Sequence, residues 1–83
     1  MMKTEIFSKA IKNRNRIKFY YSMEQLTIDP YIISLDKEGK KIIYGKLNES
    51  DTVLKFEFKK IYNIKVLENE NFAPRMTNSG RFN

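Results

Sequence analysis

The sequence predicts a mainly β fold with one N-terminal helix, in which five short strands form a small, strongly bent antiparallel sheet. With 83 residues, the chain has room for one domain with a thin hydrophobic core. Apolar residues follow helical spacing before Asn13 and alternate with polar residues after Asn15. The turn sequences "DKEGK" and "NESD" divide the alternating part into strand-sized segments.

Residues 4–13 are expected to form the helix. Thr4 can serve as the N-cap, and Glu5 suits the positive end of the helix dipole. Asn13 and Asn15 both tolerate the left-handed backbone conformation that ends helices. Four apolar residues lie at helical spacing and form one face: Ile6, Phe7, Ala10 and Ile11.

The first strand, "RIKFYYS", has a period of two, which is typical of a half-buried strand. One face is apolar and aromatic and is expected to point inward: Ile17, Phe19 and Tyr21. The outer face carries two cations and an aromatic ring: Arg16, Lys18 and Tyr20.

The second strand, "QLTIDPYIISL", contains Pro30. Proline cannot donate a hydrogen bond to a neighbouring strand, so it predicts a sheet edge, a bulge or a bend. Gly39 is expected to supply the positive φ angle of the following turn. The third strand, "KIIYGKL", contains Gly45, which predicts a bend or a close approach of another backbone segment.

The fourth strand, "VLKFEFKK", is expected to turn Leu54, Phe56 and Phe58 inward, and "IYNIKVL" is the fifth strand. The sequence therefore predicts a single domain over residues 1–75, with Phe72 docked on it, and a flexible tail over residues 76–83. A helix and five short strands in a chain of this length favour an SH3-like or Sm-like β-barrel.

The charge balance favours an anionic partner. Sixteen Lys and Arg residues oppose ten Asp and Glu residues, which gives a net charge of +6. Nucleic acid is the first candidate partner and a membrane surface the second, while a merely solvated positive surface is the alternative. The absence of Cys indicates the cytoplasm, and no apolar run is long enough to span a membrane.

The composition argues against an enzyme. The chain has neither His nor Cys, so the commonest general base and the strongest nucleophile are missing. The carboxylates are scattered without acid–base or metal-ligand spacing, and no glycine-rich phosphate loop is present. We therefore expect a non-enzymatic protein without a metal or cofactor.

Basic and aromatic residues on one sheet face can hold phosphates and stack bases, which predicts a nucleic-acid or nucleotide site. For Tyr21, packing in the barrel with the hydroxyl at the rim is the alternative role. The candidate contact residues are Arg16, Lys18, Tyr20, Tyr21, Tyr31, Lys59, Lys60 and Arg75.

Five pieces of sequence, in order, resemble a WYL domain, the SH3-like barrel of many bacterial transcription regulators and phage-defence systems. The resemblance covers roughly residues 6–75. Its pieces are the Ala-Ile pair of the helix, the first-strand pattern, the acidic–Pro–Tyr step, the aromatic strand with a basic–Ile pair, and a closing Phe–x–Pro–Arg. They fall on Ala10 and Ile11; Ile17, Lys18, Phe19 and Tyr21; Asp29, Pro30 and Tyr31; Phe56, Lys60 and Ile61; and Phe72, Pro74 and Arg75.

The chain also departs from the family pattern. Lys41, Ile42 and Ile43 stand where the family has Trp-Tyr-Leu. Ile32 and Lys59-Lys60 stand where the family places pocket arginines, whose planar fork lysine lacks. The resemblance thus implies general phosphate attraction more than recognition of one nucleotide, and a sensor barrel without the usual winged helix-turn-helix.

Two functions follow as hypotheses. The first is a stand-alone WYL-like module that binds single-stranded nucleic acid or a nucleotide ligand and thereby modulates a regulatory or phage-defence system. The second is a small protein-interaction module, a phage or mobile-element accessory that docks on a protein of a defence or transcription complex. A homodimer is compatible with both hypotheses, and exposed apolar residues at the barrel edge would favour the second.

Overall fold

One antiparallel sheet of five strands and one N-terminal helix make up the computed structural model, which describes residues 2–48 and 50–71. The helix α1 (Lys3–Asn13) precedes β1 (Asn15–Tyr21), β2 (Glu24–Leu35), β3 (Lys41–Leu47) and β4 (Val53–Glu57). A single 3₁₀ turn, η1 (Phe58–Lys60), then leads into β5 (Ile61–Asn71). The predicted fold class is confirmed.

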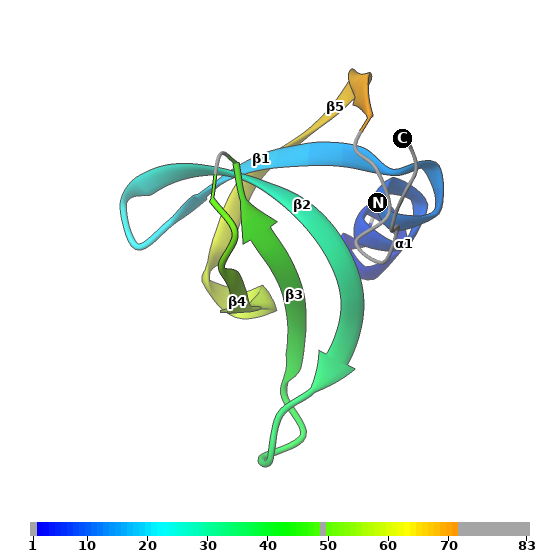
Figure 1. Cartoon of the computed structure of the whole chain (residues 1–83). Coiled ribbons are helices and arrows are strands. Elements are labelled where there is room, and N and C mark those ends of the chain that lie inside the picture. The colour runs from blue at the N-terminus through cyan, green and yellow to red at the C-terminus, as the bar shows by residue number, and fades with distance from the viewer. Residues whose placement is uncertain (1, 49, 72–83) are drawn as a thin grey trace.

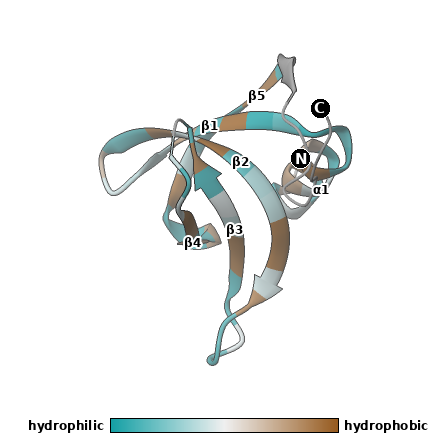
Figure 2. Ribbon diagram, in the orientation of Figure 1, coloured by the Kyte–Doolittle hydropathy of each residue, from teal (hydrophilic) through white to brown (hydrophobic). Residues whose placement is uncertain are grey.

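The strands lie in the order β4-β3-β2-β1-β5, and every neighbouring pair is antiparallel. β1 and β2 are long, curved ribbons, with α1 beside the sheet (Figure 1). The strong bend is consistent with a small barrel-like fold. Brown hydrophobic and teal hydrophilic segments alternate along the strands (Figure 2), as expected for a sheet with one buried face.

The core lies between the inner face of the sheet and α1. Its buried side chains come from the helix, every strand and η1: Phe7, Ala10, Ile17, Phe19, Ile28, Ile43, Phe56, Phe58 and Ile61. The rings of Phe7 and Phe58 meet edge to face at 5.0 Å, which joins the helix to η1. Ile11, expected in the core, is only partly buried at its edge.

The helix ends at Asn13, as predicted, but begins one residue earlier than predicted, and both of its caps differ from the predicted ones. Met2 is the N-cap rather than Thr4, and the Glu5 carboxylate accepts a hydrogen bond from the Met2 amide at 3.3 Å. Thr4 instead accepts a hydrogen bond from the Lys41 ammonium. The left-handed residue at the C-terminus is Arg14, with φ 55°, rather than Asn13 or Asn15. Asn15 is already the first residue of β1.

The predicted breaks in the second and third strands occur, each with its own cause. Pro30 lies in β2, an inner strand of the sheet, and the pairing with β3 shifts register between Pro30 and Ile32. Pro30 therefore marks a bulge rather than an edge. Gly39 has φ 81° in the β2–β3 turn. A Cβ on Gly45 would lie 2.6 Å from Ile28 Cδ1 and 2.9 Å from the Asp29 carbonyl oxygen, so the backbones do approach closely.

The fourth strand is shorter than predicted. It ends at Glu57, and Phe58–Lys60 form η1, which turns the chain into β5. Phe56 and Phe58 are buried as expected, but Leu54 is 36% exposed because β4 is an edge strand. β5 extends beyond the predicted Leu67 to Asn71. The predicted docking of Phe72 and the predicted tail over residues 76–83 lie outside the described residues.

Candidate nucleic-acid interface

Four side chains lie together on the outer face of β1 and β5, as two directly opposed pairs. Lys18 pairs directly with Lys65, and Tyr20 pairs directly with Tyr62. Directly paired residues of antiparallel strands point to the same face of the sheet. We call these four residues the outer-face cluster. It contains two of the predicted contact residues, Lys18 and Tyr20, and two residues from β5 that the sequence interpretation did not include.

Lys18 and Lys65 lie directly opposite each other. Like charges in directly opposed positions destabilise a strand pair, by roughly 0.2–1 kcal/mol. Among the residues whose side chains the structure describes, 2–48 and 50–68, no carboxylate forms an ion pair with Lys18 or Lys65. The two ammonium groups therefore form a local positive charge without an ion-pair partner among these described side chains.

The two tyrosines are exposed beside this charge. Tyr20 is 41% exposed and Tyr62 is 61% exposed, so both rings present an aromatic surface to solvent. The Lys3 ammonium lies 5.6 Å from the centroid of the Tyr62 ring and donates a 2.6 Å hydrogen bond to the Phe58 carbonyl oxygen. Lys3 thus adds a third positive charge from the helix, and its hydrogen bond to η1 holds it in place.

A buried carboxylate holds two further cations on the same face. Asp29 is 3% exposed, and its Oδ1 accepts a 2.7 Å hydrogen bond from Arg16 Nε. Its Oδ2 lies 3.6 Å from the Lys46 ammonium, which arrives from β3. The Arg16 guanidinium pairs with Asp29 and remains partly exposed, and its role as a contact residue stays a prediction. Asp29, Arg16 and Lys46 together carry one formal positive charge in excess.

The other two predicted tyrosines lie elsewhere. The Tyr21 ring packs edge to face on Phe19 and Phe56, and its hydroxyl accepts a hydrogen bond from the Glu57 amide at 3.1 Å. These contacts correspond to the packing role that the sequence left open. Tyr31 lies at the β2 bulge, half-buried, between Pro30 and Ile32.

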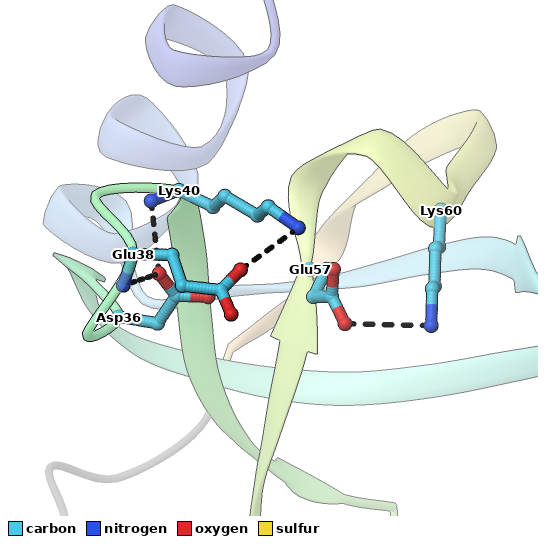
Figure 3. A network of polar contacts seen from close by, with 5 residues as sticks. All are labelled: Asp36, Glu38, Lys40, Glu57 and Lys60. Carbon is cyan, nitrogen blue, oxygen red and sulfur yellow. Dashed lines mark hydrogen bonds and ion pairs between the residues drawn. The ribbon is translucent and has the colours of Figure 1, made fainter.

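The predicted lysines of the fourth strand lie on η1, in a mixed-charge region. Lys60 forms a 3.3 Å ion pair with Glu57, and Lys59 is exposed. Figure 3 shows Lys60 and Glu57 close to the β2–β3 turn, where Lys40 contacts Glu38 at 3.1 Å. Acidic and basic residues lie side by side here, so Lys40 and Lys60 have carboxylate partners, whereas the lysines of the outer-face cluster oppose each other.

The β2–β3 turn is organised by one carboxylate. Asp36 Oδ1 accepts hydrogen bonds from the Lys40 and Glu38 amides, both at 2.9 Å (Figure 3). The Lys40 amide bond lowers the pKa of Asp36, although desolvation partly opposes it. The hydrogen bond to Glu38 in turn raises the pKa of Lys40. The hydrogen bonds that cause these pKa shifts stabilise the turn, and the shifts do not indicate a reactive group.

Tyr62 and Lys65 are missing from the sequence prediction because of a bulge. They are three residues apart, so strict alternation would place them on opposite faces. Asn63 has φ 54°, and the β1–β5 pairing shifts register here, which returns both side chains to the outer face. Asn63 within "IYNIKVL" is the sequence feature that could have indicated this bulge, since Asn tolerates a positive φ angle.

Several findings bear on the remaining predictions. Arg75 lies outside the described residues. No helix in the described part of the chain is both long and apolar enough to cross a membrane. A comparison of the chain with protein-family models, with curated proteins and with solved structures finds no match.

Proposed function

We propose that this chain is a stand-alone WYL-like module that binds single-stranded nucleic acid across the outer face of β1 and β5. Lys18, Lys65 and Lys3 would contact phosphates, and Tyr20 and Tyr62 would stack on bases. The module would act in the cytoplasm by occupying the strand, or by modulating a regulatory or phage-defence partner.

The observation that carries this proposal is the direct pairing of Lys18 with Lys65, next to the direct pairing of Tyr20 with Tyr62. A phosphate between two opposed ammonium groups turns their mutual repulsion into attraction. Charge-assisted contacts to phosphate are the main source of affinity in nonspecific nucleic-acid binding. Exposed tyrosines beside such a charge supply base stacking, worth about 1–3 kcal/mol per base.

A single strand fits this surface better than a duplex. Stacking on tyrosine requires bases that are free of a double helix, and proteins that bind single strands combine a positive groove with such rings. A duplex reader commonly inserts a helix or a β-ribbon into the major groove. Here α1 packs on the sheet through Phe7 and Ala10, which are buried in the core.

The test is fluorescence anisotropy with labelled single-stranded DNA and RNA of about 16 nucleotides, the upper end of the site sizes of small barrels. We expect micromolar or weaker affinity that falls steeply as salt rises, because released counterions drive the binding. A duplex of the same length is the comparison. Absence of binding to either single strand at low salt would contradict the proposal.

One observation favours the alternative, a protein-interaction module. Ile32 and Leu35 on β2 are 57% and 60% exposed, and Leu54 on the edge strand β4 is 36% exposed. A partner protein with an acidic surface and apolar side chains could cover such residues. If neither single strand binds at low salt, this alternative becomes the preferred account.

A further inference from the structure

A cavity of about 180 Å³ opens between α1, the start of β1 and β5. Its walls are apolar and come from Ile6, Ala10 and Val66, while Lys9 and Glu68 line it with charged groups. Pockets for drug-sized ligands measure about 300–1,000 Å³. The cavity therefore has room for one small planar group rather than for a whole dinucleotide.

Asn15 lines this cavity and is only 6% exposed. Its Nδ2 donates a long hydrogen bond, 3.5 Å, to the Glu68 carbonyl oxygen. Within the described residues, no group donates a hydrogen bond to its Oδ1. Buried polar atoms in folded proteins nearly always have a hydrogen-bond partner, so this acceptor, which lines a cavity, is available to a donor from a bound molecule.

The free atoms of Asn15 define what that molecule must offer. The Glu68 carbonyl uses one of the two Nδ2 hydrogens, which leaves one donor hydrogen and the Oδ1 acceptor. A complementary ligand has an acceptor and a donor side by side on a flat edge. All four nucleobases have such an edge, and adenine is favoured because the paired contact of Asn with its N6 and N7 atoms is the common form of base recognition by this side chain.

We propose that this cavity is a nucleobase pocket with a preference for adenine. The base lies between the side chains of Ile6, Ala10 and Val66, and the Asn15 amide pairs with its edge. The inference deepens the proposed function and rests on it, because a bound strand or nucleotide is what would supply the base. The pocket adds base preference to a surface that otherwise contacts only phosphates and ring faces.

The test uses adenosine. Because adenosine is neutral, its binding should not depend on the lysines of the outer face. In NMR titrations of the ¹⁵N-labelled protein, we expect saturable shifts at the Asn15 side-chain amide and at the Ala10 and Val66 backbone amides. Affinity for adenosine should exceed that for guanosine, cytidine and uridine by at least about fivefold, the lower limit for one paired contact.

Two variants make the test specific. Asn15→Leu keeps the shape and removes both polar groups, so the fold should persist while the preference for adenosine disappears. Ile6→Phe fills the cavity and should abolish the shifts. The Lys18→Ala/Lys65→Ala double variant should bind adenosine like the wild type.

Each failure has a separate meaning. Loss of oligonucleotide binding with intact adenosine binding would overturn only the proposed outer-face function. Absence of saturable shifts at the cavity, or an Asn15→Leu variant that still prefers adenosine, would overturn only the pocket.

Discussion

Asp29 is the residue on which the outer face most depends. It is buried and joins Arg16 of β1 to Lys46 of β3 across the β2 bulge. A buried carboxylate between two cations contributes little net stability when intact, because desolvation offsets the attraction. Its removal is costly, since two partly buried cations then lose the carboxylate between them.

We therefore predict that Asp29→Ala lowers the free energy of unfolding by about 3 kcal/mol, the lower end of the cost of breaking a buried pair. Urea unfolding followed by circular dichroism measures this change. Lys46→Met is the control, and it should cost less than about 1 kcal/mol, because the Lys46 contact is long and partly exposed. Equal losses in the two variants would show that Asp29 is not the centre of the cluster.

At the scale of elements, the helix end decides where β1 begins. Arg14 adopts φ 55° and its amide bonds to the Ala10 and Ile11 carbonyl oxygens, which closes the helix. This conformation costs an L-residue about 1–2 kcal/mol, and glycine largely avoids that cost. This change from helix to strand at Arg14 places Asn15 on the buried face of β1 and Arg16 on its outer face.

We predict that Arg14→Gly raises the free energy of unfolding by up to about 1 kcal/mol. Lys12→Gly removes the same charge from the same helix end, but at a helical position, and should lower it by about 1 kcal/mol. Thermal and urea unfolding give both values. A destabilised Arg14→Gly variant would mean that the arginine side chain, rather than the backbone angle, sets the helix end.

The β2–β3 turn gives a prediction about pH. The amides of Lys40 and Glu38 hold the pKa of Asp36 below its ordinary value of 3.8, so the ionised carboxylate favours the folded turn. The stabilisation is complete above that ordinary value and is lost as the pH falls through the lower pKa of the folded protein. NMR titration of the Lys40 amide should show a midpoint below 3.8.

Asp36→Asn is the matched variant, because its amide oxygen can still accept hydrogen bonds but does not titrate. The Lys40 amide of this variant should show no midpoint in the acid range. A wild-type midpoint at or above 3.8 would contradict the role given to the two amide bonds.

At the scale of the molecule, the sequence predicts the fold better than the site. Alternating residues in "RIKFYYS" give the two faces of β1, because a half-buried strand requires that period. The pairing of β1 with β5 joins residues far apart in the chain, so no local pattern reveals it. The sequence pattern places Arg16 on the outer face but does not reveal its ion pair, because Asp29 becomes its neighbour only after β2 folds back.

The outer-face cluster depends on two such long-range facts, the β1–β5 register and the Asn63 bulge. Together they concentrate part of the net charge of +6 on one side of the sheet. The β2–β3 turn, by contrast, mixes both signs of charge. We therefore propose that single-strand binding depends more on where Lys18 and Lys65 lie than on how many lysines the chain has.

The most direct test compares the salt dependence of single-strand binding in two double variants with the same net charge. Lys18→Ala/Lys65→Ala removes the outer-face lysines, and Lys12→Ala/Lys37→Ala removes two exposed lysines from the helix and the turn. Each phosphate contact contributes about 0.7 to the slope of log affinity against log salt concentration. We predict that the first variant loses about 1.4 units of slope and that the second keeps the wild-type slope; equal slopes in the two variants would contradict the account.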